Sequence, residues 1–267
     1  KSHSLFHDAP HGSSFPSTTA KQMGPGRRPT AAQVLASLIC LYHVPHRAFS
    51  LSFSLDFSDA GAGSSIIVAG DALISPPTLQ LTKNSQASYR YKVPLWNGAI
   101  GEMASFATAF SFQITPEKDS LPQQTGDRRM AFFLGHLPSA DVPRSSSLAD
   151  GTGNTRIVAV EFDALLNHVG IDINSTASAH TKAAWTGKKL TTSSVMEATV
   201  EYNSDSRMLA VALLIDGALY QVNATVNLRR ILPEEVAIGF SAVNGGAAGL
   251  HRILSWSFSS SLPESKR

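Results

Sequence analysis

The sequence has a single cysteine, no long apolar run and almost no excess of charge of either sign. Because Cys40 is the only cysteine in 267 residues, no disulfide within the chain can hold the fold together. The 22 Lys and Arg residues face 20 Asp and Glu residues, and the formal net charge of +2 provides no basic field for nucleic acid or an anionic membrane. The apolar residues, 43% of the chain, must therefore stabilise the fold through one sizeable core.

A run of mainly apolar residues lies near the N-terminus, over residues 31–44, and this run is too short for a membrane span, which needs roughly 20 residues. Arg27 and Arg28 precede it and small residues follow, an order typical of a secretory signal peptide. An ordinary buried helix is the alternative. We expect residues 23–48 to be the signal peptide and residues 1–22 to be disordered or an upstream extension of the gene model. The mature protein would be secreted, or delivered to the vacuole through the secretory pathway.

Two acceptor sequences for N-linked glycans begin at Asn174 and Asn223. Patterns this short also arise by chance. They are consistent with a glycoprotein that passes through the secretory pathway.

Short alternating runs dominate the sequence from Phe49 onward, separated by Gly, Pro, Asn and Ser. In the clearest run, one face collects Ala104, Phe106, Thr108, Phe110 and Phe112. A period of two predicts a β-strand, since successive side chains of a strand point to opposite faces.

Further strands are predicted along the rest of the chain. The alternating segments 196–202 and 209–215, joined by the turn 203–206, predict a hairpin, and the apolar segment 130–134 predicts a strand buried on both faces. Apolar side chains that face the core are also expected at Val236, Ile238 and Phe240, and at Leu254, Trp256 and Phe258. The sequence therefore predicts an all-β protein with two packed antiparallel sheets in one domain, residues 49–262, followed by a tail, residues 263–267.

An ordered series of segments resembles the legume lectin domain of plants. The segments are FSLSFSLDFS, GDALISPPTLQLT, VPLWNGAIGEMASFATAFSFQI, RMAFFL, VAVEFD, HVGIDINS, LPEEVAIGFSA and HRILSWSF. The resemblance implies a concanavalin-like jelly-roll sandwich, which agrees with the strand pattern. It also implies a shallow glycan site built from loops and shaped by calcium and manganese ions, and homodimers that form through a flat sheet.

The resemblance places metal ligands at Glu161, Asp163 and His168, with Asn167 as a further ligand and sugar contact. Carboxylates and an amide oxygen suit calcium, and imidazole suits a transition metal. Only residues 164–167 separate Asp163 from His168, where the family usually has a longer loop with a second carboxylate and an aromatic residue. The alternative is that these carboxylates are hydrogen-bonded groups at a strand end and that His168 is structural.

Sugar contacts are expected from Asp127, from Asn167, and from Gly246 and Ala247 in a glycine-rich loop. The family's sugar-binding Asp aligns with Arg128, so Asp127 can replace it only if the chain bulges there. Trp96 and Trp256 fall at core positions of the family, whereas the role of Trp185 is open. The sugar contacts implied by the resemblance predict a glycan or glycoprotein as partner.

Three functions compete at this point. A carbohydrate-binding lectin without catalysis is favoured, and a degenerate lectin-fold defence or inhibitor protein that acts through protein contacts is the alternative. A glycosidase needs a pair of carboxylates about 5 Å or more apart, and the further carboxylate expected after Asp163 is replaced by Leu165 and Leu166. The sequence therefore predicts that the protein is not an enzyme.

Overall fold

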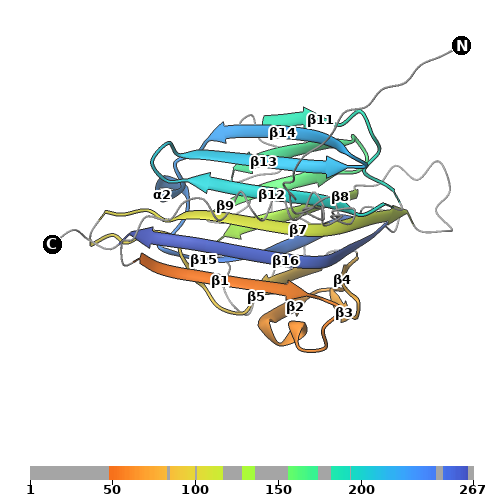
Figure 1. Ribbon diagram of the computed structural model, residues 1–267, viewed down its shortest axis with the longest axis horizontal. Helices are drawn as coiled ribbons and strands as arrows, with labels where there is room; N and C mark the ends of the chain where they lie inside the picture. The colour runs from red at the N-terminus through yellow and green to blue at the C-terminus, as the bar shows by residue number, and fades with distance from the viewer. Residues whose placement is uncertain are drawn as a thin grey trace, which may run out of the picture. The chain divides into compact units, whose positions relative to one another are not determined.

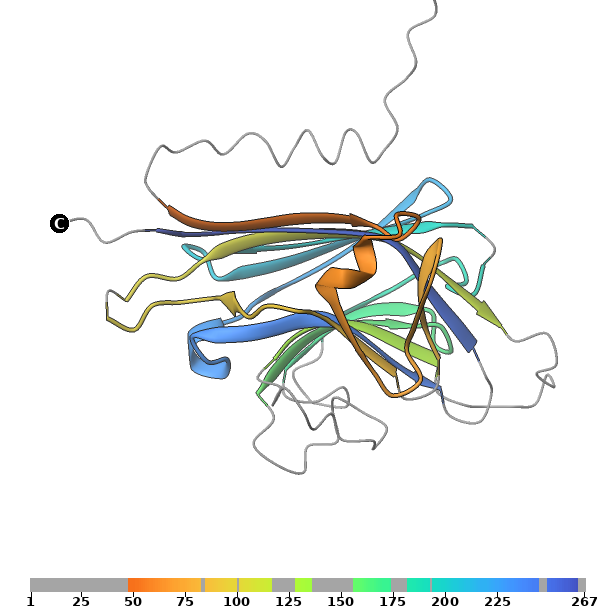
Figure 2. The ribbon, with the colours of Figure 1, turned by 90° about the horizontal axis from the view of Figure 1, so that it is seen from below.

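The computed structural model describes residues 48–82, 85–99, 101–116, 128–135, 156–173, 182–192, 194–244 and 249–263. Within these ranges the chain forms two layers of antiparallel β-strands (Figures 1 and 2). Each layer is an eight-stranded sheet. The predicted fold class, an all-β sandwich, is confirmed.

The first sheet, called the β7 sheet, has its long strands at the centre. In spatial order it contains β14 (Ala218–Thr225), β13 (Met208–Ile215), β12 (Met196–Asn203), β7 (Ser105–Pro116), β16 (Gly249–Pro263), β4 (Thr78–Leu81) and β3 (Leu73–Ser75), with β1 (Ala48–Asp56) also paired to β16. The predicted hairpin is the β12–β13 unit, in which Tyr202 pairs with Leu209.

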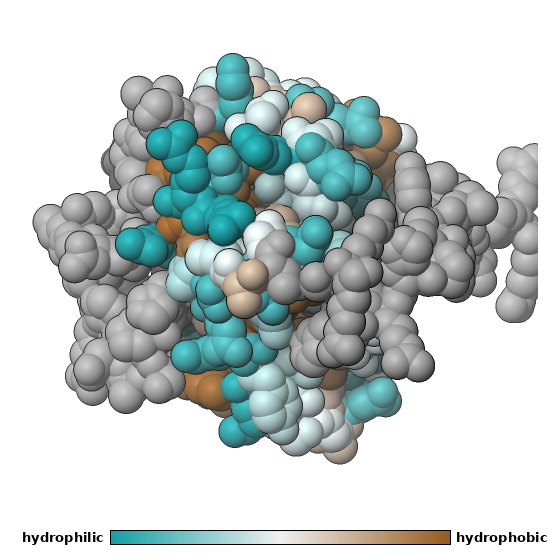
Figure 3. All heavy atoms as spheres, turned by 90° about the vertical axis from the view of Figure 1, so that its left-hand side faces the viewer, coloured by the Kyte–Doolittle hydropathy of each residue, from teal (hydrophilic) through white to brown (hydrophobic). Residues whose placement is uncertain are grey.

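The second sheet, called the β9 sheet, carries the predicted metal ligands. In spatial order it contains β11 (Lys182–Trp185), β10 (His168–Ile173), β9 (Ile157–Asp163), β8 (Arg128–Gly135), β15 (Glu235–Asn244), β5 (Ser85–Tyr89) and β2 (Ile66–Ala69), with β6 (Val93–Pro94) on β15. Two single-turn helices, η1 (Ala62–Ser65) and α2 (Leu228–Ile231), complete the described chain, and neither is long or apolar enough to cross a membrane. Side chains at the end of the sandwich that carries α2 are mainly hydrophilic (Figure 3).

The core lies between the sheets and is rich in aromatic rings. Phe106, Phe110 and Phe112 are buried on one face of β7, and Met130 to Leu134 are buried on both faces of β8, as the sequence predicts. Trp256 is fully enclosed: its ring lies 4.9 Å from those of Phe53 and Phe240, and its indole N–H donates to Thr108 Oγ1 at 2.9 Å. Burying rings of this size supplies much of the free energy that stabilises a domain without disulfides.

The side chains of β16 that face the core differ from the prediction at one residue. The pairing register of β16 with β7 shifts between Ile253 and Ser255, so that Ile253 is fully buried and Leu254 is only partly buried. A bulge inserts one residue into a strand and reverses the alternation beyond it. The predicted inward position of Leu254 is therefore wrong, whereas those of Trp256 and Phe258 are right.

Candidate functional site

A row of four side chains crosses the outer face of the β9 sheet. Backbone pairing aligns Arg129 of β8 with Asp163 of β9, Asp163 with His168 of β10, and His168 with Trp185 of β11. Their chain neighbours Met130, Phe162 and Val169 point the other way, into the core. Because neighbouring strands lie about 4.8 Å apart, the register places a guanidinium, a carboxylate, an imidazole and an indole side by side.

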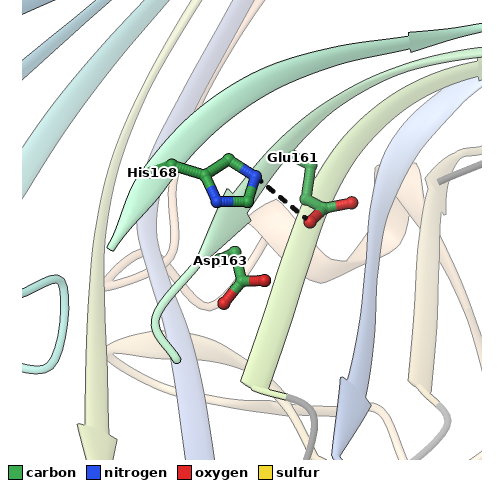
Figure 4. A group of neighbouring side chains, drawn as sticks. All are labelled: Glu161, Asp163 and His168. Carbon is green, nitrogen blue, oxygen red and sulfur yellow. Dashed lines mark ion pairs between the residues drawn. The ribbon is translucent and has the colours of Figure 1, made fainter. Parts of the chain in front are cut away.

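Glu161 joins this row from its position two residues before Asp163. Each of Glu161, Asp163 and His168 offers one atom that could bind a metal ion, and these three atoms lie within 4.8 Å of one another. His168 Nε2 is 3.7 Å from Glu161 Oε1. The three side chains converge in Figure 4, with the imidazole opposite the two carboxylates. Their residues are only 3%, 5% and 9% exposed, respectively. Ionisable groups this well buried need compensating partners.

The connection from β9 to β10 is a tight turn that its own hydrogen bonds close. Asp163 Oδ1 accepts from the backbone N–H groups of Leu165 and Leu166 at 2.7 and 2.8 Å. Asn167 has a φ of 55°, a left-handed conformation that Asn tolerates better than most residues. Its side-chain Oδ1 accepts from Leu190 N at 3.0 Å, and its carbonyl oxygen accepts from Thr186 N at 2.8 Å. The turn is thus fixed at both ends by protein groups.

Glu161 stays protonated at neutral pH when no ion is bound. Burial, a hydrogen bond with the Asp172 carboxyl and the negative charge of Asp172 together raise the pKa of Glu161 to about 9, although the Arg129 guanidinium opposes them. Arg129 Nη1 lies 3.7 Å from Glu161 Oε2. The buried Glu161 carboxyl therefore holds a proton beside a cation, and a metal ion can bind there only by displacing that proton.

Comparison with known proteins identifies the source of this arrangement. The Legume lectin domain family matches residues 50–267. The chain belongs to the legume lectin family. Among its relatives, Lectin 10 of Medicago truncatula is 34% identical over 232 residues, which cover 74% of this chain and 79% of that protein. Lectin 8 of the same plant is 33% identical over 273 residues, covering 88% and 96%.

Solved legume lectins share the fold as well. A structure of basic winged bean lectin with Tn-antigen superimposes with a TM-score of 0.71 at 30% identity, covering 80% of this chain and all of that one. The resemblance read from the ordered segments is therefore confirmed. The boundaries expected for the domain, 49–262, stay a prediction.

Legume lectins generally hold calcium and manganese, and the described residues of this one fit the two ions unequally. Two carboxylates and an imidazole form a donor set suited to a transition metal. Ligands around one such ion, with bonds of about 2.1 Å, lie at most about 4.2 Å apart, so the observed group needs to contract only slightly. Calcium needs about six to eight oxygens. The turn offers few, because Asp163 Oδ1 and Asn167 Oδ1 already accept backbone hydrogen bonds.

The predicted site residues divide into three groups. Glu161, Asp163 and His168 are brought together, and Asn167 lies in the adjoining turn, where its amide oxygen fixes the chain. Asn223 is exposed on β14. Four predicted residues lie outside the described ranges, as do residues 1–47: Asp127, Asn174, Gly246 and Ala247.

Arg129 and Asp172 also belong to the site, although neither was predicted from the sequence. Asp172 stands four residues after His168 on the same strand, β10. Extending the same-face rule along β10 would have found Asp172. Arg129 required the pairing of β8 with β9, which local spacing does not reveal.

The hydrogen bonds that Asp163 accepts should stabilise the fold measurably. Replacing Asp163 by Ala removes the acceptor for two backbone N–H groups and should lower the free energy of unfolding by about 1 to 2 kcal/mol. Asp163→Asn keeps an acceptor oxygen and should cost less than half as much. Urea denaturation of both variants in chelator-treated buffer measures the difference. Equal losses for both variants would show that the charge of Asp163, and not its hydrogen bonds, stabilises the turn.

Proposed function

We propose that this protein is a lectin that binds glycans without catalysis. The observation that carries the proposal is the convergence of Glu161, Asp163 and His168 on the outer face of the β9 sheet, in a chain of the legume lectin family. Its relatives are named lectins, and the winged bean lectin was solved with Tn-antigen. Hydrolysis is not part of the proposal, since the Asp163 carboxylate is engaged by its own turn and Leu165 and Leu166 follow it.

The described site supports one transition-metal ion, manganese being the family's choice, held by Glu161, Asp163 and His168. Such an ion would neutralise the clustered carboxylates and fix their orientation. Calcium is not proposed at the Asp163–His168 turn, because hydrogen bonds within the protein already close that turn.

The function is tested by glycan-array binding of the purified protein, before and after treatment with a chelator. We expect binding to a restricted set of glycans, weakened by chelation and restored by manganese without added calcium. If no glycan is bound in any of these conditions, the lectin proposal fails and the protein-contact alternative gains support. Release of reducing ends from a polysaccharide would contradict the absence of catalysis.

His168 provides a matched test of the metal site. His168→Ala removes the one nitrogen ligand of the group and should weaken manganese binding by about 100-fold or more. Loss of a residue that only hydrogen-bonds to a metal ligand typically weakens metal affinity by about 10- to 100-fold, and loss of the ligand itself should weaken it more. Metal analysis after dialysis and titration calorimetry measure the effect. Asn223→Gln is the control, since that residue lies on the β7 sheet. Unchanged manganese affinity in His168→Ala would exclude this set of ligands.

We also propose that the protein enters the secretory pathway and carries a glycan at Asn223. The side chain is exposed on the edge strand β14, where an oligosaccharide has space. In a plant expression host, Asn223→Gln should increase the electrophoretic mobility by the mass of one N-glycan, and the shift should disappear after enzymatic deglycosylation. The substitution of Ala224 by Ser leaves the acceptor intact and serves as the control. Identical mobility of all three proteins would remove Asn223 as a modified site.

A homodimer through the β7 sheet completes the proposal. Small side chains cover the outer faces of its central strands: Ser52, Ser54, Ala107, Ala109, Ser111, Ser255, Ser257 and Ser259. A flat surface of small side chains permits close approach of a second copy. Light scattering of the purified protein distinguishes a monomer from a dimer.

A further inference from the structure

Trp185 is the most exposed tryptophan of the described chain and stands at the end of the candidate row. Its residue is 67% exposed, on the edge strand β11. Trp256 is enclosed in the core, and Trp96 donates its indole N–H to Leu232 O and carries the Arg229 guanidinium over its ring. Leaving most of a large apolar ring in water is costly, since its burial would contribute several kcal/mol at about 25 cal/mol per Å².

The orientation of the indole is nevertheless set by the site. The ring centroids of Trp185 and His168 lie 5.4 Å apart at an interplanar angle of 60°, an edge contact that follows from the backbone pairing of the two residues. The indole therefore contacts the imidazole, and most of its surface faces solvent. An aromatic ring fixed in this way loses little conformational entropy when a ligand packs on it.

The imidazole that contacts the indole carries an unsatisfied polar atom. His168 Nδ1 is buried and has no hydrogen-bond partner among the described residues. A buried polar nitrogen without a partner is costly, and a ligand hydroxyl or a bound ion can remove that cost. The site thus combines an exposed aromatic face with a buried group that lacks a partner, the combination by which ligand sites position small polar molecules.

We infer that Trp185 is an aromatic platform on which a sugar ring of the bound glycan packs. A pyranose has one apolar face of C–H groups and a rim of hydroxyls, so it matches an electron-rich indole next to hydrogen-bonding side chains. The β9–β10 turn brings no aromatic residue to the site, and Trp185 supplies one from the neighbouring strand β11. The inference rests on the proposed lectin function and deepens it.

A sugar ring fits this surface better than a protein partner does. Leu165 and Leu166, 45% and 51% exposed in the turn, are the other large apolar side chains that the described chain exposes next to the row. Three such side chains cover only part of the roughly 800 Å² that each partner buries in a stable protein interface. Lys182 and Ala183, exposed on the same short strand, add little apolar area.

Affinity for the glycans identified on the array tests the platform. Trp185→Ala should weaken binding about tenfold and Trp185→Phe by about threefold or less, since a smaller ring keeps part of the packing. Leu73→Ala is the matched control: Leu73 is 57% exposed but lies on β3, at the far edge of the other sheet, and its loss should leave affinity unchanged. Thermal melting of each variant checks the fold.

Fluorescence gives a second readout that a purely structural role would not change. Iodide should quench the exposed Trp185, and bound glycan should protect it; the protection should vanish in Trp185→Phe. Unchanged affinity of Trp185→Ala together with an unprotected indole would overturn the platform while leaving the lectin function intact. If the unsubstituted protein binds no glycan, both proposals are overturned. A Trp185→Ala variant that dissociates a dimer yet keeps its glycan affinity would overturn the platform in favour of a protein contact.

Discussion

Acidification from pH 7 to pH 4 should destabilise the protein by about 3 kcal/mol more than it destabilises a His251→Met variant. His251 is fully buried on β16, paired with Leu81 of β4 and Ile114 of β7. Burial lowers the pKa of His251 from 6.5 to about 4, and a backbone hydrogen bond with Leu81 only partly opposes this. In the unfolded chain the imidazole takes up a proton near pH 6.5, whereas in the folded protein it stays neutral until about pH 4.

The sign of this effect follows from proton linkage. Because the folded pKa lies below the unfolded one, the contribution of His251 is fully present above pH 6.5 and is lost as the pH falls toward 4. His251→Met removes the titrating group at similar volume, and every other ionisable group is common to both proteins. Urea denaturation at intervals of half a pH unit gives the two stability curves. Parallel curves between pH 4 and pH 7 would mean that the pKa of His251 is the same in the folded and the unfolded protein.

The strand faces could be predicted from the sequence because a period of two is a local property. Phe106, Phe110 and Phe112 are buried together for that reason, and Glu161 and Asp163 point the same way. The family resemblance added the partner across the sheet, His168. Local pattern and family resemblance were sufficient for the sandwich and for three members of the site.

What the sequence did not reveal depends on pairing between distant segments. The bulge at Leu254 is defined by its register against β7, and the row from Arg129 to Trp185 by three successive strand pairings. The role of Asp163 as the acceptor that closes the turn depends on the backbone directions of Leu165 and Leu166. A fully buried His251 likewise has no local signal, since its neighbours in space come from β4 and β7.

The Glu161 carboxyl connects the stability of the fold to metal binding. Its folded pKa of about 9 lies above the unfolded value of 4.5. By the same linkage, its stabilising contribution is fully present below about pH 4.5 and declines as the pH rises toward 9. A manganese ion bound at Glu161 displaces the proton, so metal affinity should increase over the same pH range. Metal and proton therefore compete for one buried carboxyl.

Glu161→Gln should separate these two effects. Without metal, the variant should be more stable than the unsubstituted protein by about 2 kcal/mol at pH 8, and the difference should vanish near pH 4.5. Added manganese should raise the melting temperature of the unsubstituted protein and leave Glu161→Gln unchanged. Glu197→Gln on β12, in the other sheet, is the control and should respond to manganese normally. A Glu161→Gln variant that is stabilised by manganese as strongly as the unsubstituted protein would remove Glu161 from the set of ligands. The raised pKa of Glu161 would then reflect only its burial and the neighbouring Asp172 carboxyl.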